Sequence, residues 1–171
     1  LPEWPTEFHP EEYATADAPR VRREAIKLML QGQQRPDLRS QGIVLGLGDA
    51  DDAVMRLGIS AALEGCPPAA EPFLAKLLDH KDEEVRVLAI RVFATLRSRR
   101  SRDLLLQQVL AKKKWWRRTR LNQPSPEMLA ALRGLAAAWA RHPDVQVVMG
   151  LAGRSGVRDI RHAAGRAEAT P

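Results

Sequence analysis

The stretch Asp82-Glu-Glu-Val-Arg-Val-Leu-Ala89 decides the fold, because altered copies of it occur along the chain. Its acidic start suits the positive end of a helix dipole, and its first valine stands four positions before a small residue. Four of the five copies keep Ala or Gly at that position, where a small side chain lets neighbouring helices approach closely. The copies begin at five apolar residues: Val21, Val54, Val85, Met128 and Ile160.

The distances between these copies predict a repeat of two helices. They are 33, 31, 43 and 32 residues, and about 32 residues hold two helices of roughly a dozen residues with two short turns. Apolar residues recur with the helical period, and β-branched residues are too scattered to favour strands. Helix starts are expected at Asp17, Asp51, Asp82 and Ser125, and helix ends at Gly32, Gly65 and Gly153.

The copies at 17–25 and 82–89 resemble the second helix of a HEAT repeat, in the short bacterial form first noted in phycobilin lyases. An arginine follows the apolar residue in three copies, as Arg22, Arg86 and Arg161, whereas the copy at Val54 carries Arg56 instead. The resemblance implies an all-α fold, an αα-superhelix or HEAT-like solenoid of about four to five helix pairs over residues 17–165. It also implies that these acids and arginines form caps and contacts between neighbouring repeats.

The net charge of +6 is concentrated in one part of the chain. Residues 97–120 hold ten basic side chains and one acid, whereas the other 147 residues hold 17 basic and 20 acidic side chains. The single cysteine excludes an internal disulfide and a cysteine-rich zinc site. No apolar run is long enough to span a membrane, and the start lacks a secretory signal. We therefore expect a cytoplasmic protein. The high Ala, Leu and Arg content favours a bacterial source, and the first residue, Leu rather than Met, indicates part of a longer chain.

A basic insertion at 112–124 fills the longest of the four spacings and is the strongest candidate for a binding site. Loops that interrupt a repeat commonly carry binding residues, and Trp and Arg are enriched at binding hot spots. Three interpretations remain open: an acidic protein segment binds there, a nucleic-acid backbone binds there, or the tryptophans pack on helix ends while the charges stay solvated. The candidate binding residues are Lys112, Lys113, Lys114, Trp115, Trp116, Arg117, Arg118 and Arg120.

The first sixteen residues form an acidic arm with three aromatic residues, Trp4, Phe8 and Tyr13. Two interpretations fit them: a cap that covers the open face of the first repeat, anchored by Trp4 and Phe8, or a linker from an upstream domain. Residues 166–171 show no pattern and are expected to be a frayed tail.

Residues for catalysis are scattered. His9, His80, His142 and His162 do not form a recognised metal-binding pattern, and nothing marks a base for Cys66 in its turn. Gly42, Gly46 and Gly48 lie in a helical stretch with no preceding strand, so a nucleotide loop is not indicated. We therefore expect no catalytic or metal-binding residue, no cofactor and no enzyme. The predicted function is a non-catalytic HEAT-repeat scaffold for a partner with an acidic segment, and the alternative is a DNA-binding HEAT-like module.

Overall fold

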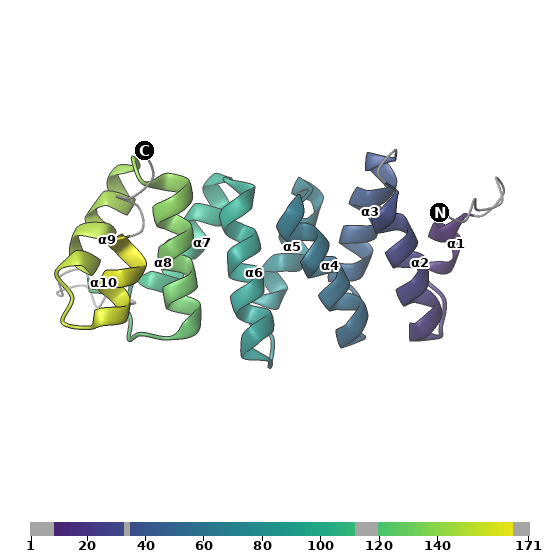
Figure 1. The fold of residues 1–171 in the computed structure, drawn as a ribbon, viewed down its shortest axis with the longest axis horizontal. Coiled ribbons are helices and arrows are strands. Elements are labelled where there is room, and N and C mark those ends of the chain that lie inside the picture. The colour runs from purple at the N-terminus through teal and green to yellow at the C-terminus, as the bar shows by residue number, and fades with distance from the viewer. Residues whose placement is uncertain (1–8, 33–34, 112–119, 166–171) are drawn as a thin grey trace. The chain divides into compact units, whose positions relative to one another are not determined.

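The computed structural model describes residues 9–32, 35–111 and 120–165, and this part of the chain is helical without a β-strand (Figure 1). The all-α prediction is confirmed. None of the described helices has the length and apolar character needed to cross a membrane. The helices are α1 (Pro10–Tyr13), α2 (Pro19–Gln31), α3 (Pro36–Leu47), α4 (Asp52–Glu64), η1 (Pro68–Ala70), α5 (Glu71–Leu77), α6 (Glu83–Leu96), α7 (Arg99–Val109), α8 (Pro126–Trp139), α9 (Pro143–Gly153) and α10 (Arg158–Gly165).

The helices form two compact units, which are described separately. The boundary lies between Phe73 and Leu74, inside α5. In the first unit α2, α3 and α4 pack on one another, and in the second unit α8 packs against α6, α7, α9 and α10. Within each unit, consecutive long helices run in alternating directions (Figure 1). This arrangement agrees with the predicted two-helix repeat, because the five sequence copies fall on α2, α4, α6, α8 and α10.

The apolar residue that opens each copy is buried in four of the five cases. Val54, Val85, Met128 and Ile160 are at most 3% exposed. Val21 differs, because 43% of it is exposed, and α2 buries Ala25, Ile26 and Met29 instead. Among the described residues, Val21 is therefore not part of the core, unlike its four counterparts. The described part of the acidic arm contributes Ala14 to the same core, while Trp4 and Phe8 lie outside the described residues.

Most of the predicted helix caps are present. The side chains of Asp51, Asp82 and Ser125 accept hydrogen bonds from backbone N–H groups in the first turns of α4, α6 and α8. Asp17 does not cap α2, whose N-cap is Ala18 without a side-chain hydrogen bond. Gly32 and Gly65 are C-caps, and Gly153 is the last residue of α9.

The small residue in the copy at Val54 brings α3 and α4 into backbone contact. A Cβ atom at Gly58 would lie 2.6 Å from the backbone nitrogen of Leu47 and 2.7 Å from the backbone carbonyl carbon of Gly46. A Cβ at Gly46 would in turn lie 2.9 Å from the Cα of Gly58. These distances are shorter than van der Waals contact, so the two helices can pack this closely only with glycine at both positions.

We predict that Gly58→Ala lowers the free energy of unfolding by about 2 kcal/mol, because the added methyl group forces the backbones of α3 and α4 apart. The matched control is Gly65→Ala in the same unit. Gly65 is extended, at φ 179°, and no atom lies within 4 Å of a Cβ built there, so this variant should be as stable as the wild type or slightly more so. Urea denaturation measures the free energy of unfolding of both variants. An equal loss of stability in the two would contradict the close contact between α3 and α4.

Candidate functional site

The basic insertion falls largely outside the described residues. Lys112, Lys113, Lys114, Trp115, Trp116, Arg117 and Arg118 all lie there, so their predicted binding role stays a prediction. Arg120 is described, and its side chain is exposed. The structure therefore describes only the residues on either side of this segment, and these residues belong to the second unit.

Hydrogen bonds hold the two flanks of the insertion together at the end of α7. The Ala111 N–H donates to the carbonyl of Arg120 at 2.9 Å, and the Asn122 N–H donates to the carbonyl of Val109 at 2.8 Å. The Asn122 side chain donates to the Gln108 carbonyl at 2.8 Å. The ten-residue segment 111–120 is thus closed at its base. The sequence analysis gave Asn122 no role, and its signal is the ability of Asn side chains to bond to nearby backbone.

In the first unit an arginine joins two repeats. The Nη1 of Arg22 donates to the carbonyls of Ala16 and Asp17, at 2.9 Å each. Its Nε and Nη2 donate to the two carboxylate oxygens of Asp49, at 2.7 and 2.8 Å. Asp49 lies in the turn before α4. The guanidinium of Arg22 therefore connects the start of α2 to the start of α4. We call such a contact, from an arginine to an acid of the following repeat, a rung.

The second unit contains the same arrangement at Arg86. Its Nη1 donates to the carbonyls of His80 and Lys81, at 2.7 and 3.1 Å. Its Nε and Nη2 lie 2.9 and 2.7 Å from the Oε1 of Glu127, in the first turn of α8. The implied contacts between repeats are therefore confirmed for Arg22 and Arg86. Their acidic partners are Asp49 and Glu127, which the sequence pattern did not indicate.

Arg161 repeats one half of this arrangement. Its Nη1 donates to the carbonyl of Ser155 at 2.7 Å, six residues earlier, as in Arg22 and Arg86. No carboxylate in the described ranges pairs with its guanidinium. Among the described residues, Arg161 therefore has the anchoring half of a rung without the acid of a following repeat.

The rungs lower the pKa of both carboxylates. The hydrogen bond from Arg22 holds the pKa of Asp49 below its ordinary value and outweighs the opposing effect of burial. Burial raises the pKa of Glu127, but hydrogen bonds from its own backbone N–H and from the side chains of Arg86 and Ser125 outweigh it, so that this pKa is also lowered. Both rungs therefore favour the charged carboxylates and the folded state that holds them.

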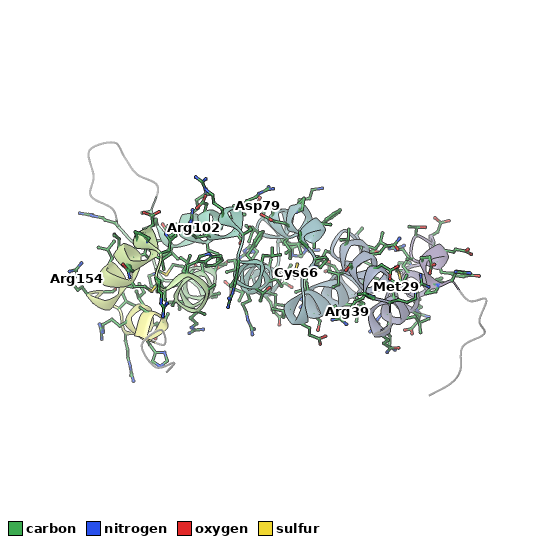
Figure 2. All side chains as sticks on the ribbon, turned by 90° about the horizontal axis from the view of Figure 1, so that it is seen from above. Met29, Arg39, Cys66, Asp79, Arg102 and Arg154 are labelled. Atoms are coloured by element: carbon green, nitrogen blue, oxygen red, sulfur yellow. The ribbon has the colours of Figure 1, made fainter. Side chains whose placement is uncertain are left out.

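The candidates for catalysis remain apart. Cys66 lies in the turn after α4, where burial and then the nearby charge of Glu71 raise the pKa of its thiol to about 11, so the thiolate is disfavoured (Figure 2). His142 lies 2.6 Å from the Nη1 of Arg102, so its Nε2 accepts that hydrogen bond. Within 9–32, 35–111 and 120–165, no group of three or more His, Cys, Asp or Glu side chains is arranged to hold a metal ion.

Comparison with known protein families identifies the kind of repeat to which this chain is similar. The family model described as HEAT repeats matches residues 40–123. Residues 40–123 are thus similar to HEAT repeats. The fold is similar to a chain in the structure of the complex of CpcE and CpcF of phycocyanin lyase from Nostoc sp. PCC7120, with 19% sequence identity and a TM-score of 0.59. The match covers 98% of this chain and 68% of that chain, which confirms the predicted HEAT-like solenoid. Comparison with curated protein sequences finds no match.

The expectation that the chain is not an enzyme has to be corrected. The HEAT-like solved structure with the same fold belongs to a phycocyanin lyase, so this fold occurs in an enzyme-type complex. Our argument for a non-enzyme depended on the HEAT resemblance and on the scatter of catalytic residue types. A fold by itself does not exclude an activity, because activity depends on sites placed on the fold.

We predict that acid weakens the rungs. The pKa values of Asp49 and Glu127 are lower in the folded than in the unfolded chain, so their stabilisation is present above about pH 4.5 and is lost as the pH falls through the folded values. Arg22→Gln should therefore be less stable than the wild type near neutral pH, and the difference should shrink in acid. Urea denaturation of Arg22→Gln and of the wild type, at neutral pH and in acid, measures this difference in the free energy of unfolding.

The matched control is Arg23→Gln, because Arg23 is an exposed neighbour on α2. Its difference from the wild type should be small and the same at both pH values. A constant difference for Arg22→Gln across the acid range would contradict the assigned role of Asp49.

Proposed function

We propose that the chain is a HEAT-repeat interaction module that binds an acidic segment of a partner protein through residues 112–120. The observation that carries this proposal is the closed base of the insertion. Hydrogen bonds among residues 108–111 and 120–122 fix both ends of a segment that contains six basic residues and two tryptophans. A binding segment with fixed ends loses less conformational entropy when it binds than one with free ends.

The charge around the insertion supports an acidic partner. Asp103 is the only acid between residues 97 and 120, and it accepts hydrogen bonds from the Nε and Nη2 of Arg102 at 3.0 and 2.7 Å. This ion pair leaves the other basic residues of the stretch in excess. Arg120 is exposed beside the closed base, and arginine can bind a carboxylate through two parallel hydrogen bonds.

The tryptophans distinguish a protein partner from simple charge attraction. Trp115 and Trp116 can bury apolar surface in a partner, and such contacts persist at salt concentrations that screen exposed charges. The solved structure with the same fold is itself a complex of two different proteins, CpcE and CpcF. A protein partner for this chain fits that precedent.

We predict that neutralising part of the insertion weakens partner binding. Lys112, Lys113 and Lys114 are changed to Gln together, and partner binding should weaken by at least about tenfold. The matched control changes Arg91, Arg133 and Arg141 to Gln, three exposed bases of the second unit, and should bind within about threefold of the wild type. Affinity capture from the source cells identifies the partner, and titration with that purified partner gives the affinities.

A second variant and a second probe separate the two kinds of partner. Trp116→Ala should weaken protein binding even at about 0.5 M salt, where exposed charges are screened. Duplex DNA is titrated in parallel, and a DNA-binding module would show a log–log salt slope of about 0.9 for each phosphate contact. Partner binding that is unchanged in both insertion variants, or tight binding to DNA alone, would contradict the proposal.

A further inference from the structure

We propose that the hydrogen bond between Arg102 and His142 is a pH-sensitive contact within the second unit. At neutral pH the uncharged imidazole of His142 accepts from Arg102 and so joins the start of α9 to α7. In mild acid the protonated imidazole breaks this contact and pairs with Asp144 instead. This inference goes beyond the proposed function, because it involves no residue of the basic insertion.

The guanidinium of Arg102 is held in place from within α7 (Figure 2). Its Nε and Nη2 donate to the Oδ1 of Asp103 at 3.0 and 2.7 Å, and only 15% of its side chain is exposed. Its Nη1 lies 2.6 Å from the Nε2 of His142. Because an arginine side chain stays protonated and can only donate, this Nε2 is the acceptor. The contact therefore exists only while Nε2 carries no hydrogen.

The backbone of His142 is fixed at the start of α9. Its N–H donates to the Trp139 carbonyl at 2.8 Å, and its carbonyl accepts from the Gln146 N–H at 2.9 Å. Since Nε2 accepts, the hydrogen of the neutral ring is on Nδ1, which is buried and makes no hydrogen bond with the described residues. Nδ1 lies 3.9 Å from the Oδ2 of Asp144. This distance is too long for a hydrogen bond but suits an ion pair once the ring is charged.

Protonation changes the partner that the imidazole of His142 can bind. A charged ring donates from both nitrogens, so it cannot accept from Arg102, and it places a second positive charge beside the guanidinium. The same charge attracts the carboxylate of Asp144. Histidine ordinarily gains its proton between about pH 8 and 5, which is above the range in which carboxylates become protonated. The direct connection between α7 and α9 is therefore lost in mild acid, while the rungs to Asp49 and Glu127 remain.

The other charged side chains around the start of α9 leave this exchange to Arg102 and Asp144. In the part of the chain that the structure describes, none of them forms a hydrogen bond or an ion pair with His142. They are Arg99, Arg100 and Asp103 on α7, Glu127 and Arg133 on α8, Arg141 in the turn before α9, and Arg158, Asp159, Arg161 and His162 on α10, which packs against α9.

NMR of the imidazole nitrogens tests which atom of His142 carries the hydrogen. Long-range proton–nitrogen spectra distinguish the two ring nitrogens, and His142→Gln assigns the signals of His142 by their loss. At about pH 7.5 the wild type should carry hydrogen on Nδ1 and none on Nε2. The exposed His162, which makes no hydrogen bond within the described ranges, should show a mixture of both forms. Hydrogen on the Nε2 of His142 at this pH would overturn the proposal.

Two variants should move proton uptake by His142 in opposite directions. Arg102→Met removes the guanidinium, so the ring should gain its proton at a pH higher by about half a unit or more. Asp144→Asn removes the partner of the charged ring and should lower that pH by a similar amount. The matched control, Arg141→Gln, removes a neighbouring exposed charge without a hydrogen bond and should shift it by less than about 0.2 unit. Shifts of Arg102→Met and Asp144→Asn in the same direction, or no shift in either, would overturn the proposal.

A double-mutant cycle measures whether the contact joins the two helices. Arg102→Met, His142→Ala and the double variant are compared with the wild type by urea denaturation at about pH 7.5 and about pH 5.5. The coupling free energy between Arg102 and His142 should be favourable at the higher pH and lost at the lower. The effect of Arg102→Met on Asp103 is present with and without His142, so it cancels in the cycle. Circular dichroism at both pH values establishes that each variant is folded, and a coupling that is absent or equal at the two pH values would contradict the proposal.

Discussion

The guanidinium groups of Arg22 and Arg86 each bind backbone carbonyls of the turn before their own helix and a carboxylate of the next repeat. The placement of neighbouring repeats within each unit depends on these guanidinium contacts. They satisfy carbonyls at the turn, they fix the start of one helix relative to the start of another, and they hold Asp49 and Glu127 in their charged forms. A lysine could not replace either arginine, because a single ammonium group lacks the planar fork that binds both partners at once.

Packing between helices adds a second constraint to these rungs. The backbone contact between Gly46 and Gly58 allows α3 and α4 to approach closely, and the rung from Arg22 holds the turn that joins them. In the second unit, Gly134 plays the same part in α8, because a Cβ there would lie 2.8 Å from the Cβ of Ala94. The ion pairs thus set the register of the helices, and the small residues set their separation.

The sequence predicted this architecture from local features. Helix caps at Asp51, Asp82 and Ser125 depend on residues a few positions apart, and the repeat spacing depends on buried apolar residues, so both could be recognised directly. The partners Asp49 and Glu127 could not be recognised, because Arg22 and Arg86 are 27 and 41 residues away from them. The exposure of Val21 was also missed, since its local pattern is similar to that of the buried Val85 and its place in the first helix pair differs.

The candidate site was predicted in part. The composition located the basic insertion, and Arg120 is exposed as a binding residue must be, but the role of Asn122 at the closed base required the fold. Composition also led to the wrong expectation about enzymes, because the scatter of His and Cys residues describes one chain and not an assembly. The similarity to a phycocyanin lyase complex shows that this fold takes part in such assemblies.

The most direct test of the rungs is a double-mutant cycle between Arg86 and Glu127, with Arg86→Gln, Glu127→Gln and the double variant compared by urea denaturation. Both side chains are mostly buried, at 26% and 16% exposed, so we expect a coupling free energy of about 1 to 2 kcal/mol at neutral pH. Strictly additive losses, with a coupling free energy near zero, would contradict the claim that this ion pair joins one repeat to the next.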